Sequence, residues 1–185
     1  FRGREVSQST KIYDQTGSIL LWEIHGEERR TIVPFDKISR HIKNASIAIE
    51  DRTFYTHRGV RIFSLLRVLF LNAFEGKKIG TGGSTITQQL VKNNLLTPEQ
   101  TISRKIKEII IGLKLEATYS KYEILQLYLN EIPYGSNSYG IESAAETYFG
   151  TSAEDLTLAQ ASYLAALPRA PSYYSPYGNH REALE

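Results

Sequence analysis

The sequence predicts a mainly α-helical fold with a short β hairpin at its N-terminal end. Apolar residues recur at helical spacing in most segments after residue 36. Several of these segments carry helix-start and helix-stop signals, whereas the segment before them alternates as a strand does. The 185 residues suit one domain, and the 41% hydrophobic and 23% charged fractions are those of a folded soluble protein.

The first predicted elements are a hairpin and a helix that ends in two acids. Residues 11–14 and 19–24 contain alternating apolar side chains and flank a glycine-centred turn, which indicates a hairpin. The helix that follows has apolar residues at Ile38, Ile42, Ala45 and Ile49. Asp36 is placed to cap its first turn, and the helix delivers Glu50 and Asp51 at its C-terminal end.

The middle of the chain contains its most apolar segment. Ten of the thirteen residues 62–74 are apolar, which fits either a buried core helix or a segment dipping into a membrane surface. Residues 76–84 include four glycines and are predicted to form a mobile loop. A helix is predicted over 85–96, and Thr97 with Pro98 predicts the start of the next.

Three further helices are predicted in the C-terminal third. Ser120 and Glu123 form a capping box at the start of the first. Residues 135–140 are predicted to be a loop. The last two helices are expected to end at Gly150 and Pro168.

Composition excludes several classes of function. A net charge of +2 lacks the strongly basic signature of a general nucleic-acid binder. The chain has no cysteine and no HxxxH histidine pair, so disulfides and thiolate or histidine metal sites are not indicated. No stretch reaches the roughly 20 apolar residues of a membrane-spanning helix. Because the chain opens on Phe1 and not on Met, we interpret it as a piece from which an anchor has been removed.

Glu50 and Asp51 are the first candidates for chemistry. They would be solvated acids at a helix end if they had no function, but acids oppose the helix dipole at a C-terminus. The aromatic pair 54–55 would partly desolvate a carboxylate here and make it a proton acceptor near neutral pH. His57 and Gly59 are expected to shape the turn and not to act as base or ligand.

The second candidate is the segment GGSTITQQLVKN, residues 82–93. Glycines that lead into Ser and Thr at a helix start present free N–H groups and hydroxyls, which suits an anion. It is not a P-loop, because no lysine precedes Ser84. A plain polar helix face is the alternative. Two adjacent stripes of this helix hold the polar residues Ser84, Thr85, Gln88, Gln89 and Lys92.

The third candidate is a concentration of positive charge. Residues 76–107 contain six cations and the single acid Glu99. Arg104 and Glu108 lie four apart on one helical face, where they could form no more than a surface ion pair. The functional alternative is a cradle for a diphosphate, in which Glu108 orients the cations or a metal. A base, this cradle and an apolar flank together fit a substrate with a nucleophilic hydroxyl, a diphosphate and a lipid tail.

Five sequence blocks occur in order along the chain: EDRTFYTHRG (50–59), GGSTITQQLVKN (82–93), RKIKE (104–108), KYEILQLYLNEIPYG (121–135), and AAETYFG continuing to LTLAQASYLAALPRAPS. With these blocks, most of the chain resembles the peptidoglycan glycosyltransferase domain (glycosyltransferase family 51) of class A penicillin-binding proteins and monofunctional transglycosylases. Departures from the family pattern are small: Gln160 stands where an acid is expected, and Ser175 with Pro176 where Asn-Pro is usual.

The resemblance implies a lysozyme-like, two-lobed helical domain over residues 1–185, with a large head lobe and a small membrane-associated jaw that contains residues 62–74. It implies polymerisation of lipid II into glycan strands on the outer face of the bacterial cytoplasmic membrane. The membrane surface, lipid II and the growing strand are the expected partners, and nucleic acid is not. A muramidase-like hydrolase and a non-enzymatic lipid-diphosphate binding module are the alternatives.

The resemblance also implies roles for residues. Glu50 would deprotonate the 4-hydroxyl of the acceptor N-acetylglucosamine, which attacks the anomeric carbon of the donor N-acetylmuramic acid with inversion and releases undecaprenyl diphosphate. Glu108 would be the second catalytic carboxylate. A divalent cation, Mg²⁺ or Mn²⁺, could assist, with Asp51 as a possible contributor. The expected substrate-binding residues are Asp51, Ser84, Thr85, Gln88, Gln89, Lys92, Arg104, Lys105 and Asn130.

Class A penicillin-binding proteins also carry a transpeptidase with an S-x-x-K nucleophile motif. No S-x-x-K occurs in these 185 residues, so acylation by β-lactams is predicted to be absent. A transpeptidase domain is expected in the full-length chain if the parent is bifunctional.

Overall fold

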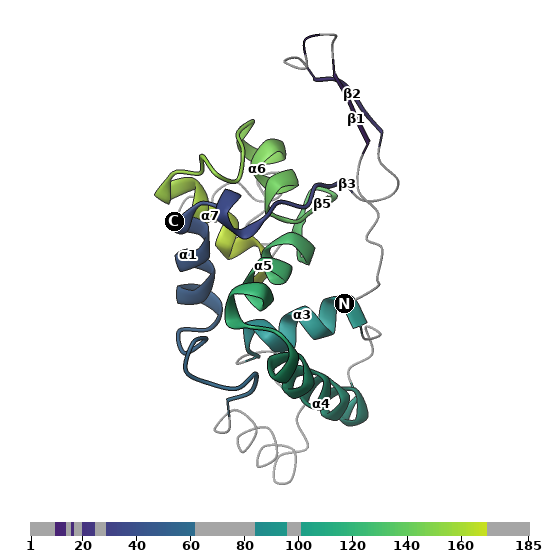
Figure 1. Cartoon of the computed structure of the whole chain (residues 1–185), viewed down its shortest axis with the longest axis vertical. Helices are drawn as coiled ribbons and strands as arrows, with labels where there is room; N and C mark the ends of the chain where they lie inside the picture. Colours follow the sequence, from purple (N-terminus) through teal and green to yellow (C-terminus); the bar gives the residue numbers. More distant parts are fainter. Residues whose placement is uncertain are drawn as a thin grey trace, which may run out of the picture.

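The structure, a computed structural model, describes residues 10–13, 16, 20–24, 29–61, 84–95 and 101–169. Within them the chain is mainly α-helical with an N-terminal β hairpin, which confirms the predicted fold class (Figure 1). The apolar segment 62–74 and the loop 76–83 lie outside the described residues. The expected division into a head lobe and a jaw depends on these segments and stays a prediction.

The predicted hairpin is confirmed. Strands β1 (Thr10–Tyr13) and β2 (Leu20–Ile24) pair antiparallel, with Thr10 opposite Ile24. Figure 1 draws this hairpin apart from the helices.

Helix α1 (Arg40–Glu50) ends at the predicted acid but begins later than expected. Asp36 is not its cap and lies instead in a 3₁₀ turn, η1 (Phe35–Lys37). Ile38 has an extended backbone that interrupts the helical run. The hydroxyl of Ser39 therefore caps the helix by accepting a hydrogen bond from the His41 N–H in its first turn.

The next three helices bring the site residues together. They are α3 (Ile86–Leu95), α4 (Ile102–Thr118) and α5 (Lys121–Glu131). The predicted start of α4 at Thr97 is wrong, because Thr101 has the extended backbone of a cap and accepts a hydrogen bond from the Arg104 N–H.

A small sheet lies beside these helices. Strand β5 (Ser138–Tyr139) pairs parallel with β3 (Arg29–Arg30) and antiparallel with β4 (Pro133–Gly135). The prediction that residues 135–140 are a loop is therefore wrong in part. The two residues between β4 and β5 both have positive φ, as a tight hairpin turn requires.

The last helices match their predicted stop signals. Helix α6 (Ile141–Phe149) ends at Gly150, which is left-handed. Helix α7 (Leu158–Ala166) opens with a capping box formed by Thr157 and Gln160. A 3₁₀ turn that contains Pro168 follows it, η2 (Leu167–Arg169).

The core centres on α5, which lies between other helices in Figure 1. Helix α1 packs against α7, and α3 packs against both α4 and α5. The ends of α1 and α3, which carry the predicted site residues, are thereby held against the core. In the described part of the chain, no helix has the length and apolar character needed to cross a membrane. The fully buried residues of α5 and α3 include Ile86, Leu90, Ile124, Leu125 and Leu129.

Candidate active site

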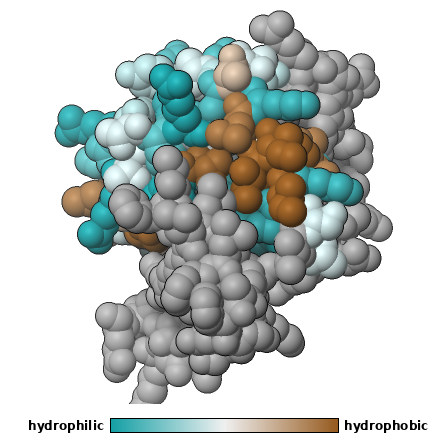
Figure 2. All heavy atoms as spheres, turned by 90° about the horizontal axis from the view of Figure 1, so that it is seen from below, coloured by the Kyte–Doolittle hydropathy of each residue, from teal (hydrophilic) through white to brown (hydrophobic). Residues whose placement is uncertain are grey.

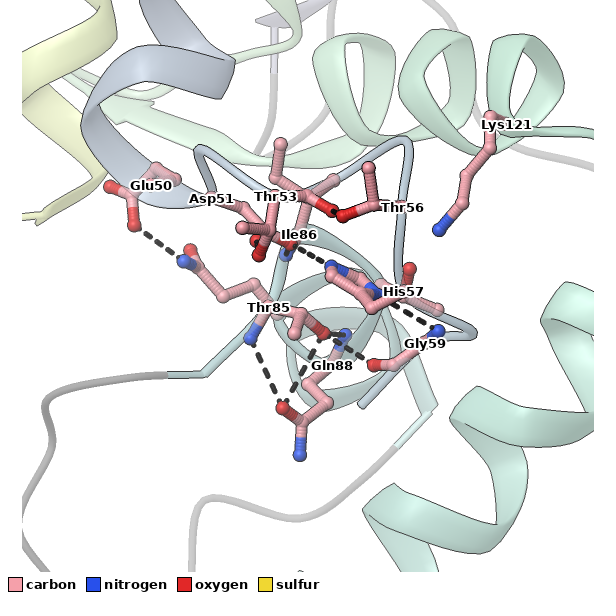
Figure 3. Close-up of polar contacts among 12 residues, drawn as sticks. Glu50, Asp51, Thr53, Thr56, His57, Gly59, Thr85, Ile86, Gln88 and Lys121 are labelled. Carbon is pink, nitrogen blue, oxygen red and sulfur yellow. Dashed lines mark hydrogen bonds and ion pairs between the residues drawn. The ribbon is translucent and has the colours of Figure 1, made fainter. Parts of the chain in front are cut away.

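Glu50 is the last residue of α1, and its carboxylate meets α3. The side-chain amide of Gln89 donates from Nε2 to Oε2 of Glu50 at 2.5 Å (Figure 3). The other carboxylate oxygen, Oε1, is buried and has no hydrogen-bond partner within the described residues. Each oxygen of a carboxylate can accept two hydrogen bonds. Oε2 therefore keeps one acceptor position beside Gln89, while Oε1 faces the protein interior.

The neighbouring acid, Asp51, is committed to the protein. Its side chain is fully buried. Oδ2 lies 2.7 Å from Nε2 of His57 and accepts a hydrogen bond from the Ile86 N–H at 3.2 Å, while Oδ1 accepts one from Thr53 at 3.4 Å. Asp51 thus joins the end of α1, the following turn and the start of α3, as Figure 3 shows.

The turn after Asp51 is fixed by His57 and Gly59, as the sequence predicted. Nδ1 of His57 accepts a hydrogen bond from the Gly59 N–H at 3.0 Å. Gly59 has φ +83°, and a Cβ there would lie 2.9 Å from Cγ of Glu116 and 3.0 Å from the carbonyl oxygen of Gly112. Glycine therefore permits both the backbone conformation and the close approach of the turn to α4.

Two of the predicted binding residues, Thr85 and Gln88, stabilise the start of α3. Thr85 donates from Oγ1 to the carbonyl of Gly59 at 2.6 Å and accepts from the Gln88 N–H at 3.1 Å. Oε1 of Gln88 accepts in return from the Thr85 N–H at 3.1 Å. Both side chains are buried. This reciprocal pair holds the helix start against the 51–61 turn.

A cationic cluster lies where α3 begins and α4 makes its first turns. The buried carboxylate of Glu108 pairs with the ammonium of Lys105 and lies 3.5 Å from Nη1 of Arg104. Lys105 also donates to the hydroxyl of Ser84 at 3.1 Å. Two cations against one acid leave a net positive charge. Nε and Nη1 of Arg104 are buried without a hydrogen-bond partner among the described residues, so the guanidinium has unused donors.

Lys92 and Asn130 are the remaining predicted binding residues. Lys92 is exposed in the last turn of α3. Asn130 is buried, and its amide exchanges two 2.9 Å hydrogen bonds with the backbone of Val33 and donates a third to the carbonyl of Gln126. Asn130 therefore holds the segment before α1 against α5.

One polar connection was not anticipated from the sequence. Glu116 of α4 accepts a hydrogen bond from Thr87 at 2.5 Å and one from Lys121 at 2.7 Å. The Lys121 ammonium also lies 4.5 Å from the ring centre of Phe54. In the sequence these residues look like ordinary surface polar positions, because the contact joins α3, α4, α5 and the 51–61 turn.

Two buried tyrosines near Glu50 were also missed. Burial raises the pKa of the hydroxyls of Tyr128 and Tyr134, and the negative charge of Glu50 raises both further. Both hydroxyls are therefore neutral hydrogen-bond donors at physiological pH. No sequence signal points to them, because an aromatic residue in an apolar helix pattern predicts only a core position.

No group of three or more potential metal ligands occurs within the described residues. A hollow of about 480 Å³ beside the start of α1 is lined by charged residues such as Arg40 and Glu154 and contains none of the predicted site residues.

Residues 17–185 match the family described as Transglycosylase. The chain belongs to the transglycosylase family. It is 44% identical over 178 residues to penicillin-binding protein 1A of Aquifex aeolicus. The aligned region covers 96% of this chain and 24% of that protein. It is 43% identical over 168 residues to penicillin-binding protein 1F of Bacillus subtilis, covering 91% of this chain and 23% of that protein. The chain thus spans about a quarter of the length of these relatives.

The crystal structure of penicillin-binding protein 1A from Haemophilus influenzae is also similar to this transglycosylase-family chain. The sequence identity is 26% and the TM-score 0.48, over 97% of this chain and 17% of that one. The described site of the transglycosylase domain has two parts: Glu50 with Gln89, and the cationic cluster around Glu108. The first part can accept a proton, and the second can hold an anion.

Proposed function

We propose that this chain is a peptidoglycan glycosyltransferase that polymerises lipid II with inversion and releases undecaprenyl diphosphate. The observation that carries this proposal is the pairing of Glu50 with Gln89, together with membership of the transglycosylase family. A carboxylate oriented by an amide and still able to accept a hydrogen bond is suited to general-base catalysis.

In the proposed reaction, Oε2 of Glu50 takes the proton from the 4-hydroxyl of the acceptor sugar. The acceptor oxygen forms a bond to the donor anomeric carbon from the face opposite the leaving group. The bond between that carbon and the diphosphate oxygen breaks, and its electron pair leaves with undecaprenyl diphosphate. This is the geometry of an inverting glycosidase in which a sugar hydroxyl replaces water.

The leaving group requires charge neutralisation more than a proton. Arg104 and Lys105 supply this positive charge at the start of α4, and their pairing with the buried Glu108 holds both in place. Donors fixed before the reaction stabilise developing charge without reorganising. Glu108 is therefore proposed to act by positioning these cations.

A divalent cation does not fit the acids that were expected to assist it. Asp51 already accepts hydrogen bonds from three protein groups, and Glu108 is paired with two cations. Mg²⁺ or Mn²⁺ would therefore enter with the substrate diphosphate, whose oxygens are suitable ligands. The proposed mechanism assigns no step to it.

A membrane surface is the proposed setting. Helix α4 leaves an apolar stripe about half exposed, formed by Ile106, Ile110 and Leu113. Figure 2 views the molecule from the side where Figure 1 draws α4 and shows apolar side chains gathered there. Contact of this stripe with lipid would place Lys105, on the same helix, near the diphosphate of a membrane-bound substrate.

The cell-wall role and the parent protein follow from the relatives. The matched relatives are called penicillin-binding proteins, and this chain spans about a quarter of them. We propose that the full-length protein carries a transpeptidase domain and works on the outer face of the bacterial cytoplasmic membrane.

Polymerisation of labelled lipid II tests the proposal. The wild type should form glycan strands, and Glu50→Gln should bind lipid II but polymerise about 10²–10⁴-fold more slowly. Glu154→Gln is the matched control, because Glu154 is exposed and forms a surface ion pair with exposed Lys37. Binding without polymerisation by the wild type would favour a binding module, and release of fragments from finished glycan would favour a hydrolase.

A further inference from the structure

Three buried oxygen atoms from three different elements lack partners around the base. They are Oε1 of Glu50 at the end of α1, the hydroxyl of Tyr128 in α5 and the hydroxyl of Tyr134 in β4. None has a hydrogen-bond partner in the part of the chain that the structure describes. Buried polar groups nearly always have a hydrogen-bond partner, so three unpaired oxygen atoms in one region require an explanation.

The three groups are electrostatic neighbours. The charge of Glu50 acts on both tyrosines, and Tyr134 acts on Tyr128. Both tyrosines are at least 99% buried. Two neutral hydroxyls can donate and one carboxylate oxygen can accept, which is a complementary set.

We propose that Tyr128 and Tyr134 hold internal water against Oε1 of Glu50 and thereby position the carboxylate. A buried water typically makes about three hydrogen bonds to otherwise unsatisfied polar groups. The three oxygens supply that number. The carboxylate is then held from both sides, by Gln89 at Oε2 and through water at Oε1.

The tyrosines are positioning residues in this proposal, because they lie inside the protein and contact no substrate. Their catalytic consequence rests on the proposed function of Glu50 as the base. With Oε1 sealed inside, only the free acceptor position of Oε2 remains for the acceptor hydroxyl. The water itself can be tested without any assay of activity.

The first test measures stability of Tyr128→Phe and Tyr134→Phe by urea unfolding. If the hydroxyl is buried and makes no hydrogen bond to water, its removal should leave the midpoint of the urea unfolding transition unchanged or raise it, because an unpaired polar group is lost. Removing one that holds water against Glu50 should lower the midpoint at constant m-value. We expect the midpoint to fall in both variants. Tyr122→Phe is the matched control, because Tyr122 is 62% exposed, and its midpoint should not move.

A double-mutant cycle links the effect to Glu50. The loss of stability caused by Tyr134→Phe should be smaller in the Glu50→Gln background than in the wild type, because the carboxylate charge that accepts the hydrogen bond from the water is absent. Unchanged or raised midpoints in both tyrosine variants, or strictly additive effects in the cycle, would overturn the proposal.

Kinetics then separate this inference from the proposed function. Each tyrosine variant should lower kcat by about three- to tenfold with an unchanged KM for lipid II, the size of one ordinary hydrogen bond. If Glu50→Gln polymerises normally, Glu50 is not the base, while the cycle still decides the water network. If Glu50→Gln is inactive and the cycle is additive, the network fails and the proposed function stands.

Discussion

Nε2 of His57 lies 2.7 Å from Oδ2 of Asp51, and this contact selects the tautomer of the imidazole. Because the Gly59 N–H donates to Nδ1, that nitrogen carries no proton. Nε2 therefore carries the proton that is donated to Asp51. The acid next to the proposed base is thus an anchor for the turn.

Asp51→Ala should destabilise the fold by about 2–4 kcal/mol, because the buried Ile86 N–H and the largely buried His57 ring lose their acceptor. The free energy of unfolding in urea measures this. Asp36→Ala, at an exposed acid in η1, should change it by less than about 0.5 kcal/mol. Unchanged stability of Asp51→Ala with lost lipid II binding would instead support the substrate-binding role predicted from the sequence.

Gln89→Ala should lower kcat for polymerisation by up to about 100-fold, because the carboxylate of Glu50 loses the donor that orients it. Steady-state kinetics with labelled lipid II measure the loss. Asn93→Ala removes an exposed amide from the same helix and should retain full activity. If Gln89→Ala raises only KM, Gln89 binds substrate and does not orient the base.

Lys105→Ala should reduce kcat/KM by about 10–100-fold, because a partly desolvated ammonium no longer neutralises the diphosphate. Lys107→Ala is the control, because it removes the same charge from an exposed position on the same helix. Its kcat/KM should stay within about twofold of the wild-type value. Equal effects of the two substitutions would mean that overall charge matters, and not the contact with Ser84 and Glu108.

Gly59→Ala should destabilise by about 2–4 kcal/mol, because it adds a clash with α4 to the cost of a positive φ. Gly150→Ala is the control. Gly150 also has positive φ, +62°, but nothing lies within 4 Å of a Cβ there, so the cost should be only about 1 kcal/mol. Equal losses in thermal or urea unfolding would show that the approach to Glu116 is unimportant.

The sequence was most informative where a signal is local. The helical spacing of Ile42 and Ile49 and the capping box of Ser120 depend on neighbours in the chain, and the corresponding helices are present. The errors concern choices between nearby residues of similar chemistry. Asp36 and Ser39 are both good caps, and only the extended backbone of Ile38 selects the second.

Pairing between distant segments could not be predicted. The resemblance implies that Asp51 and Asn130 bind substrate, and this stays a prediction. Their described partners include the backbones of Ile86 and Val33, which lie 35 and 97 residues away along the chain. Those partners depend on how α1, α3 and α5 pack. Gln89 was named as a site residue without the contact to Glu50, for the same reason.

The packing of α1 against α7 has a consequence for synthesis on the ribosome. The helix that carries Glu50 emerges early, but its partner is complete only at Ala166. Chains are made from the N-terminus at about 5–20 residues per second, so α1 waits several seconds with an apolar face uncovered. The proposed base therefore acquires its final surroundings only near the end of translation of this domain.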